Sequence, residues 1–222
     1  MHQAYCFSQG LAVSQTPKQR GKFIVLEGID GAGKSTHIDF IAATIRSAHG
    51  VEVAITREPG GTPLAEKIRE LVLHQPMDVQ TEALLVAAAR RDHIQQLIGP
   101  ALERGDWVLC DRFVDSTRAY QGGGGGVNLA WIDGINREVC GPMEPDKVIL
   151  FDLPALVAAA RRGGRGGQGD RFEVQEVAYF ERVRDVYLTQ MRPGAREKTV
   201  ILNAELDVSQ IQKELHKIII NL

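Results

Sequence analysis

The sequence lacks the marks of a membrane or secreted protein. None of its apolar runs approaches the roughly 20 residues that a membrane-spanning helix needs. Its three cysteines, Cys6, Cys110 and Cys140, are odd in number and far apart, which fits neither a disulfide framework nor a zinc site. Residues 1–20 show no basic leader followed by an apolar core, so we expect a polar extension rather than a signal peptide. These absences favour the reducing cytoplasm.

A strong excess of charge is also missing. The chain has 26 Lys and Arg against 28 Asp and Glu, a formal net charge of -2. Proteins that bind nucleic acid or membrane surfaces generally carry a basic excess, so we expect neither partner here. With 222 residues, 44% of them hydrophobic, the chain is long enough for one well-buried domain, which we place at residues 21–222.

Short apolar segments alternate with segments of helical length. The segments 23–26 and 148–151 are apolar at successive positions, as expected for parallel strands covered on both faces. We predict strands at 22–27, 51–56, 107–111, 147–152 and 199–203, and helices at 34–48, 64–73, 82–103, 177–191 and 209–220. The alternation predicts an α/β fold with a doubly wound, five-stranded parallel sheet and helices on both faces.

Two glycine clusters interrupt this pattern, at residues 122–126 and 161–169. Both clusters predict mobile loops. On composition alone, either could be no more than a flexible connection between neighbouring segments. The second cluster (RRGGRGGQG) interleaves arginines with glycines. It therefore favours a mobile lid at about residues 161–171, with a nonspecifically basic loop as the alternative.

Residues 28–35 (GIDGAGKS) follow the first expected strand and open the first expected helix. This is the context that the phosphate-binding pattern G-x-x-x-x-G-K-[ST] requires. The glycines allow backbone N–H groups to converge on phosphate oxygens, and the helix N-terminus adds positive charge. The pattern predicts a P-loop NTPase fold that binds ATP through Gly28, Ile29, Asp30, Gly31, Ala32, Gly33, Lys34, Ser35 and Thr36.

Two of these residues have distinct expected tasks. Lys34 would bridge the β and γ phosphates, and the hydroxyl of Ser35 would ligate Mg²⁺. A carboxylate at the end of a neighbouring strand should also meet the metal, and Asp111 ends the expected strand 107–111. The alternative for Asp111 is an ordinary strand-terminal cap.

The class of P-loop protein follows partly from what is missing. The sequence has no Asn-Lys-x-Asp element, which argues against a signalling GTPase, and the chain is short for a motor or transporter ATPase. A small-molecule kinase needs a second anion site. Arg57, Arg90 and Arg112 lie where they could line the carboxyl edge of the sheet and clamp a phosphate. Each of these arginines alone is more often a solvated or ion-paired surface group.

Segments 57–62 (REPGGT), 111–113 (DRF) and 119–122 (AYQG) resemble signature segments of bacterial thymidylate kinases, in the same order and spacing. The similarity runs from about residue 21 to the C-terminus, and also includes residues 84–93, 170–173 and 203–204. The resemblance implies transfer of the γ phosphate of ATP to dTMP, which gives dTDP for dTTP synthesis. It also implies a homodimer; the apolar face of helix 82–103 is a candidate interface, with plain core packing as the alternative.

The resemblance assigns roles to single residues. Asp30 would contact the deoxyribose 3′-hydroxyl, and Arg57 and Arg112 would hold the dTMP phosphate. Tyr120 would lie against the sugar and disfavour ribonucleotides. The implied substrate-binding set is Asp30, Arg57, Glu58, Pro59, Arg90, Arg112, Ser116, Thr117, Tyr120 and Gln121. In this family the peptide bond before the proline that matches Pro59 is often cis.

Base recognition is implied in the same way. Arg90 and Thr117 would read the thymine edge, with Gln121 in the same pocket. Asn203 and Ala204 would border the adenine of ATP. One departure concerns the thymine ring, because Val86 stands where a phenylalanine usually stacks on it.

The transition state of phosphoryl transfer needs positive charge at the moving group. Thymidylate kinases keep an extra arginine either in the P-loop or on the lid, and Gly31 occupies the P-loop position here. The lid must then supply it from Arg161, Arg162, Arg165 or Arg171, of which Arg162 and Arg165 are our first choices. The predicted catalytic set is Lys34, Asp30, Arg112, Arg162 and Arg165.

Two other functions remain open from the sequence. One is a kinase for another nucleoside monophosphate, such as dUMP, which lacks only the thymine methyl group. The other is a P-loop module that binds nucleotide without transferring phosphate. Such a module has no need for a second phosphate site.

Overall fold

The computed structural model describes residues 19–163, 175–191 and 197–222. Five strands form one sheet in the order β2-β3-β1-β4-β5, and all four neighbouring pairs are parallel. The strands are β1 (Phe23–Glu27), β2 (Val53–Arg57), β3 (Trp107–Asp111), β4 (Lys147–Asp152) and β5 (Thr199–Asn203). The predicted five-stranded parallel sheet is confirmed; β2 begins two residues later than expected and continues to Arg57.

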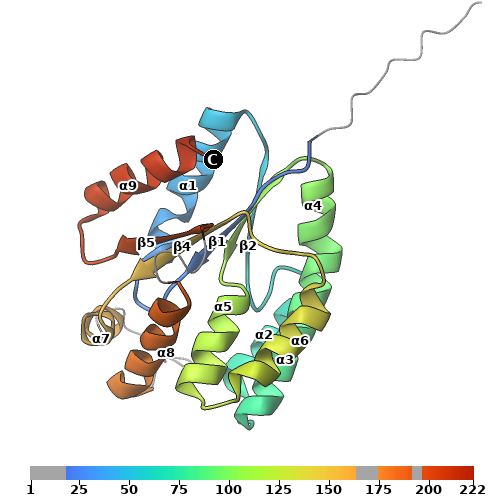
Figure 1. Ribbon diagram of the computed structural model, residues 1–222, viewed down its shortest axis with the longest axis vertical. Coiled ribbons are helices and arrows are strands. Elements are labelled where there is room, and N and C mark those ends of the chain that lie inside the picture. Colours follow the sequence, from blue (N-terminus) through green and yellow to red (C-terminus); the bar gives the residue numbers. More distant parts are fainter. Residues whose placement is uncertain (1–18, 164–174, 192–196) are drawn as a thin grey trace, which may run out of the picture.

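Helices cover both faces of the sheet (Figure 1). They are α1 (Lys34–His49), α2 (Pro63–His74), α3 (Val79–His93), η1 (Ile94–Ile98), α4 (Gly99–Glu103), α5 (Val114–Thr117), η2 (Arg118–Gly124), α6 (Leu129–Cys140), α7 (Ala155–Gly163), α8 (Val177–Gln190) and α9 (Val208–Ile220). Helices α1 and α9 lie over one face, and α5 and α8 lie over the other. Among the described helices, none is both long and apolar enough to cross a bilayer.

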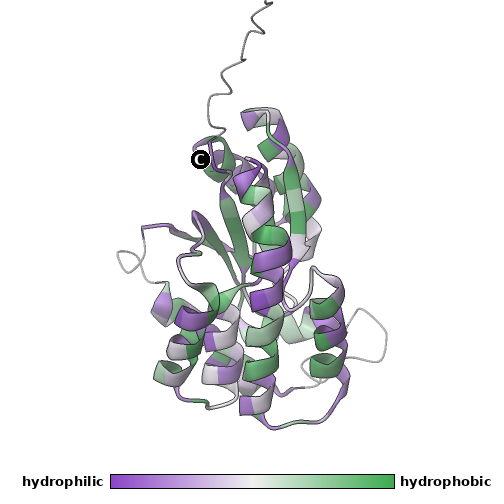
Figure 2. Ribbon diagram, turned by 90° about the vertical axis from the view of Figure 1, so that its right-hand side faces the viewer, coloured by the Kyte–Doolittle hydropathy of each residue, from purple (hydrophilic) through white to green (hydrophobic). Residues whose placement is uncertain are grey.

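The core is centred on β1, in which all five residues are buried. Phe23 meets Phe113 edge to face, with ring centroids 5.0 Å apart. The hydropathy colouring in Figure 2 shows the strands as largely apolar, whereas the helices carry both apolar and polar residues. This pattern is expected when a sheet is buried on both faces and each helix keeps one face in water.

The predicted helix 82–103 is one continuous helical segment in three parts. It begins earlier than expected, at Val79, because the Asp78 side chain caps it by accepting hydrogen bonds from the N–H groups of Gln80 and Thr81. Its middle part, η1, is a π-helix that ends two residues before Pro100. Proline has no N–H to donate and crowds the preceding turn, so a wider turn next to it lets the helix continue.

The glycine cluster 122–126 differs from the mobile loop that we predicted. Residues 122–124 belong to η2, and Gly122 and Gly124 are buried. A Cβ atom on Gly123 would lie 2.5 Å from Cγ2 of Val186 and 2.9 Å from the carbonyl oxygen of Arg182, both on α8. The absence of side chains therefore allows η2 and α8 to approach closely. Composition alone could not distinguish this packing from flexibility.

The start of the arginine-glycine segment also differs from the prediction. Arg161 and Arg162 lie in the last turn of α7, not in a loop, because the alanine-rich run before them favours a helix. Residues 164–174, which contain Arg165 and Arg171, lie outside the described part of the chain. Helices α6 and α7 were both absent from our prediction.

The contact between η2 and α8 predicts opposite effects for two glycine substitutions. Gly123→Ala should lower the free energy of unfolding by about 1–3 kcal/mol, because its methyl group overpacks the interface. Gly134→Ala is the matched control, since Gly134 lies inside α6 and its added Cβ would meet nothing within 4 Å. It should stabilise the protein by about 0.5–1 kcal/mol. Urea unfolding measures both values, and equal effects would contradict the close packing.

Candidate active site

The P-loop connects β1 to α1 and leaves the first turn of α1 open. Gly28, Gly31 and Gly33 all have positive φ, at 137°, 93° and 90°, a backbone conformation that residues other than glycine rarely adopt. Gly33 is the N-cap of α1 and provides no side-chain cap to the helix. The N–H of Thr36 donates to the carbonyl oxygen of Gly33 at 3.1 Å, and those of Lys34 and Ser35 remain available to an anion.

Lys34 is buried at the start of α1 and is held by two oxygens. Its Nζ donates a hydrogen bond of 2.9 Å to the carbonyl oxygen of Gly28 and lies 3.7 Å from Oδ1 of Asp111. Burial, helped by the positive charge of Arg112, lowers the pKa of Lys34, although Asp111 and Asp30 oppose this shift. A bound phosphate would add negative charge and favour the protonated amine.

Asp111 brings a carboxylate beside this lysine, from the end of β3. Its Oδ1 is buried and has no hydrogen-bond partner among the residues that the structure describes. Leaving a buried carboxylate oxygen without a donor is costly, so the position suits a cation. Ser35, one residue after Lys34, is exposed in the first turn of α1. These oxygens are of the kind that Mg²⁺ binds together with substrate phosphates.

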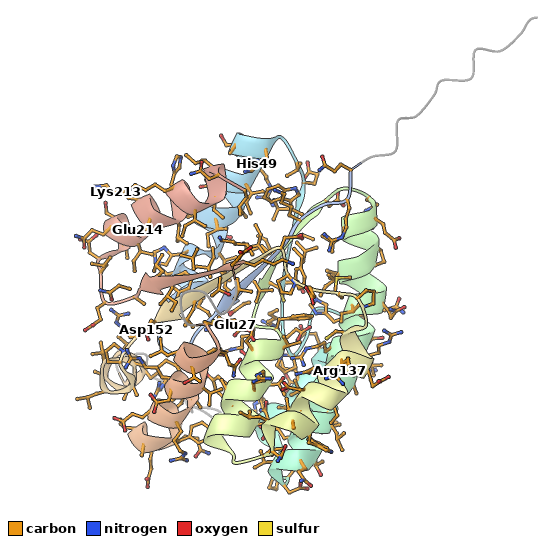
Figure 3. The ribbon with its side chains drawn as sticks, viewed as in Figure 1. Glu27, His49, Arg137, Asp152, Lys213 and Glu214 are labelled. Atoms are coloured by element: carbon orange, nitrogen blue, oxygen red, sulfur yellow. The ribbon has the colours of Figure 1, made fainter. Side chains whose placement is uncertain are left out.

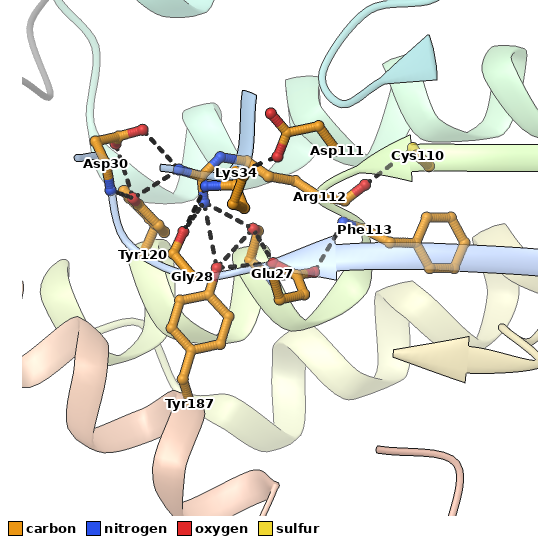
Figure 4. Close-up of polar contacts among 11 residues, drawn as sticks. Glu27, Gly28, Asp30, Lys34, Cys110, Asp111, Arg112, Phe113, Tyr120 and Tyr187 are labelled. Carbon is orange, nitrogen blue, oxygen red and sulfur yellow. Dashed lines mark hydrogen bonds and ion pairs between the residues drawn. The ribbon is translucent and has the colours of Figure 1, made fainter. Parts of the chain in front are cut away.

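Arg112 lies at the centre of the site (Figure 4). It is the one described residue other than glycine with a positive φ, at 75°. Its Nη1 donates to the carbonyl oxygen of Gly28 at 2.9 Å, and its Nη2 donates to Oδ1 of Asp30 at 2.6 Å and to the hydroxyl of Tyr120 at 3.0 Å. The guanidinium therefore joins the P-loop to η2.

Asp30 completes this arrangement with its second carboxylate oxygen. Its Oδ2 accepts a hydrogen bond of 2.8 Å from the hydroxyl of Tyr120. Burial alone would raise the pKa of Asp30, but the charges of Arg112 and Lys34 outweigh it and lower the pKa from 3.8 to about 2. Asp30 is therefore ionised at neutral pH and can accept a hydrogen bond from a substrate hydroxyl.

A cavity opens beside Arg112, with about 590 Å³ of empty space when the open solvent at its mouth is included. It lies beyond the carboxyl ends of β1, β2 and β3, which is where ligands bind in doubly wound sheets. The residues that line it are Asp30, Glu58, Pro59, Arg69, Val72, Leu73, Val86, Arg90, Arg112, Phe113, Ser116, Thr117, Tyr120 and Gln121.

Nine of the ten residues that the resemblance assigned to the substrate line this cavity, and Arg57 is the exception. Arg57 is exposed at the end of β2, where its Nη2 lies 2.9 Å from Oε2 of Glu66 on α2. The Glu58–Pro59 peptide bond is cis, as the resemblance implied. Sequence reasoning missed the lining residues Arg69, Val72 and Leu73 on α2, which belong to no motif, and gave no site role to Phe113, the last residue of the DRF segment.

Arg90 is buried and engaged on several sides. Its Nε donates to Glu58 at 2.7 Å, its Nη1 to Asn136 at 2.9 Å, and its Nη2 to Thr117 at 3.0 Å. The other oxygen of Glu58 lies 3.0 Å from Nδ1 of His93, which is also buried. This network fixes the guanidinium, because a buried charge is stable only when it is paired and hydrogen-bonded.

Helix α7 crosses over the P-loop. Nη1 of Arg162 donates a hydrogen bond of 2.7 Å to the carbonyl oxygen of Asp30, and its guanidinium lies 3.9 Å from the ring centroid of Phe180. A Cβ atom on Gly31 would lie 2.7 Å from the carbonyl oxygen of Ala158 on α7. The structure therefore has no room for a side chain at this P-loop position, whereas it brings Arg162 beside the loop.

Asn203 and Ala204 lie on the other side of β1 from the cavity, at the end of β5. The N–H of Ala204 donates to the carbonyl oxygen of Asp152, and its own carbonyl accepts a hydrogen bond of 3.0 Å from Nη1 of Arg161. Asp152 in turn binds Arg184 on α8 through both carboxylate oxygens. The two predicted nucleotide sites thus flank the P-loop strand on opposite sides.

Glu27 is a further part of the site that sequence reasoning missed. This last residue of β1 is fully buried, and its carboxylate accepts hydrogen bonds from the hydroxyls of Ser116 and Tyr187. Burial and the nearby charge of Asp115 raise the pKa of Glu27 from 4.5 to about 7, although Ser116 and Arg112 oppose the shift. Its position directly before the P-loop was the only signal in the sequence.

The raised pKa of Glu27 predicts a pH dependence of stability. The folded state binds the proton more tightly than the unfolded chain, so this contribution is fully present below pH 4.5 and is lost as the pH rises through 7. The free energy of unfolding of the wild type, minus that of Glu27→Gln, should therefore fall by on the order of 3 kcal/mol between pH 4.5 and 8. Denaturant unfolding across this range measures the difference.

The control for this measurement is Glu144→Gln, because Glu144 is exposed and pairs only loosely with Lys198, at 3.5 Å. The free energy of unfolding of Glu144→Gln, plotted against pH, should run parallel to that of the wild type. A difference between wild type and Glu27→Gln that does not change with pH would contradict the raised pKa.

Comparison with known proteins agrees with this geometry. The family model for thymidylate kinase matches residues 26–215. The chain is 48% identical over 201 residues to the thymidylate kinase of Cupriavidus necator, covering 90% of this chain and 98% of that protein. It is likewise 48% identical over 203 residues to the thymidylate kinase of Paraburkholderia phytofirmans, with 90% and 98% covered. The chain belongs to the thymidylate kinase family.

Proposed function

We propose that the protein transfers the γ phosphate of ATP to dTMP, which gives dTDP and ADP. The observation that carries this proposal is the position of Arg112, which contacts the P-loop through Gly28 and also lines the adjoining cavity. One side chain therefore links a donor site to an acceptor site. A module that only binds nucleotide needs no such second site. The names of the relatives favour dTMP as the acceptor.

The acceptor phosphate would lie against Arg112, in line with the γ phosphate on the P-loop. Its negative charge would compete with Asp30 for the guanidinium. Lys34 would bridge the β and γ phosphates and neutralise charge that develops during transfer. We keep Arg57 as a second phosphate ligand, which requires it to exchange Glu66 for the substrate.

The residues around Lys34 suit Mg²⁺. Asp111 would offer its buried Oδ1, and Ser35 would offer its hydroxyl from the first turn of α1. The metal would neutralise phosphate charge when it is bound with ATP. Lys34 would keep the donor phosphates oriented in the loop.

Recognition of dTMP would rest on the walls of the cavity. Tyr120 would lie against the deoxyribose, with Asp30 accepting a hydrogen bond from the 3′-hydroxyl. Arg90, Thr117 and Gln121 would read the base edge. Val72, Leu73 and Val86 would form an aliphatic wall where the thymine ring and methyl group pack. Asn203 and Ala204 would border the adenine of ATP.

A panel of acceptors tests the proposed function. With ATP and Mg²⁺, production of ADP should be fastest with dTMP, slower with dUMP, and near background with dCMP, dGMP and AMP. The reason is that a cytosine or purine edge leaves buried polar groups of the pocket unpaired. A coupled assay measures each rate. Preference for a cytosine or purine substrate, or no ADP with any monophosphate, would overturn the proposal.

We assign the additional positive charge to the arginines of the lid, which we place at about residues 161–171. Arg162→Ala should lower kcat by about 100-fold or more, because it removes charge stabilisation made in the transition state, while the KM for dTMP changes little. Arg165→Ala gives the same test for the second candidate. Arg104→Ala, an exposed arginine paired with Asp106, serves as the control. If kcat is unchanged in both Arg162→Ala and Arg165→Ala, the additional positive charge does not come from these lid arginines.

We also propose that each chain forms one kinase domain at residues 21–222 and that two chains form a homodimer. We place this dimer in the cytoplasm. Leucines on two adjacent helices support an interface, because Leu64 and Leu71 on α2 and Leu84 on α3 are about half exposed, at 53%, 47% and 51%. Exposed apolar residues that gather on neighbouring helices favour a contact with another protein surface. The described cysteines, Cys110 and Cys140, are free thiols, as expected in a reducing compartment. Light scattering gives the oligomeric state.

A further inference from the structure

A buried carboxylate at the end of β1 has no task in the phosphoryl transfer described above. Glu27 lies in the interior, on the side of the sheet that α5 and α8 cover (Figure 3). An ionised carboxylate in such a place is costly unless hydrogen bonds compensate it. Its two oxygens accept bonds from two different kinds of donor, and both sets of bonds lead to Arg112 (Figure 4).

The first oxygen holds the backbone that follows Arg112. Oε1 of Glu27 accepts a hydrogen bond of 2.8 Å from the N–H of Phe113 and one of 3.3 Å from the N–H of Ser116. Phe113 is the N-cap of α5 and supplies no side-chain cap itself. Glu27 therefore accepts from two N–H groups at the start of α5, of which that of Ser116 also donates to the carbonyl oxygen of Phe113, at 3.2 Å. These bonds follow directly after the left-handed backbone of Arg112, a conformation that persists only when the surroundings enforce it.

The second oxygen orients two hydroxyl groups. Oε2 accepts hydrogen bonds from Oγ of Ser116 at 2.6 Å and from the hydroxyl of Tyr187 at 2.9 Å. The two hydroxyl oxygens are 2.7 Å apart. Above its pKa of about 7 the Glu27 carboxylate is ionised and can only accept, so it draws the hydroxyl hydrogens toward itself. The oxygen lone pairs are then left for another donor.

That donor is Arg112. Its Nη1 lies 3.1 Å from Oγ of Ser116 and 3.3 Å from the hydroxyl of Tyr187. Together with the carbonyl oxygen of Gly28, these oxygens hold one side of the guanidinium. The other side, Nη2, contacts Asp30 and Tyr120, which line the cavity. The orientation of the Arg112 guanidinium thus depends on the hydroxyl oxygens of Ser116 and Tyr187, which Glu27 orients through its own hydrogen bonds.

We propose that Glu27 is a positioning residue, which orients the Arg112 guanidinium toward the acceptor phosphate through the hydroxyls of Ser116 and Tyr187. Glu27 itself touches no substrate. The inference rests on the proposed function only for the identity of the acceptor. It also gives α8 a role in the site, because Tyr187 is the side chain by which this helix reaches Arg112.

The substitution Glu27→Gln tests the proposal with almost no change in volume. Glutamine has one oxygen and one NH₂ group, so it cannot accept hydrogen bonds on both sides. Either its NH₂ group faces the N–H groups of Phe113 and Ser116, or it donates to the two hydroxyls and reverses them. In both cases Arg112 loses an acceptor or its backbone support.

We expect Glu27→Gln to raise the KM for dTMP by about 10-fold and to lower kcat by about 10-fold or more. The Kd of an unreactive ATP analogue should stay within about twofold of the wild-type value, because Lys34 does not bind Glu27. Tyr187→Phe should reproduce part of the effect, and adding it to Glu27→Gln should cause little further loss, since both act through one hydroxyl. Glu144→Gln, far from the site on an exposed ion pair, should match the wild type.

A measurement on Arg112 itself separates this inference from the proposed function. In ¹⁵N side-chain spectra of the protein without substrate, the Arg112 Nη signals should be resolved in the wild type, where both groups are bonded, and averaged by rotation in Glu27→Gln. If wild-type enzyme fails to phosphorylate dTMP, the proposed function falls, while these signals still decide the inference. If Glu27→Gln shows the same Arg112 Nη signals and the same KM for dTMP as the wild type, the inference is overturned. An equal loss of ATP and dTMP binding would also overturn it, because Glu27 would then be merely structural.

Discussion

The site depends on one partly buried guanidinium, that of Arg112, which joins segments distant in the chain. Arg112 bonds to Gly28 and Asp30 of the P-loop, to Tyr120 of η2 and to Tyr187 of α8. A cation that is largely withdrawn from water needs acceptors for most of its N–H groups. The same requirement aligns the P-loop, the cavity wall and α8. Donor and acceptor sites are therefore held in register by one set of hydrogen bonds.

Carboxylates face the cations around Arg112 without any ligand: Asp30 pairs with Arg112, and Asp111 lies 3.7 Å from Lys34. Asp30 is ionised at neutral pH and offsets Arg112 and Lys34, whereas Glu27, with its pKa raised to about 7, is only partly ionised there. The pKa of Asp30 falls because two cations face it, whereas that of Glu27 rises because burial and Asp115 prevail. A pair of nucleotide phosphates brings further negative charge to the same cations. Their binding would thus replace some of these internal contacts, above all that between Arg112 and Asp30.

Glycines have three different physical tasks in this structure. Gly33 provides no side-chain cap to α1, so the N–H groups of Lys34 and Ser35 stay open to phosphate. Gly31 is required because α7 lies directly against it, and the nearby cation comes from Arg162 instead. Gly123 allows η2 to pack on α8, which carries Tyr187 to the site. A count of glycines predicts none of these tasks, since each depends on what lies opposite.

The sequence by itself determined the sheet, the P-loop and most of the cavity wall. Strands buried on both faces and the G-x-x-x-x-G-K-[ST] pattern are local signals, and the segments REPGGT, DRF and AYQG pointed to the cavity wall through their resemblance to thymidylate kinases. Only the tertiary structure decided that Arg57 pairs with Glu66, that the glycines of η2 are packed, and that Glu27 meets Tyr187, 160 residues away. The physical reason is that periodicity and motifs fix which face of a segment is buried. Which side chains meet there depends on how distant segments pack.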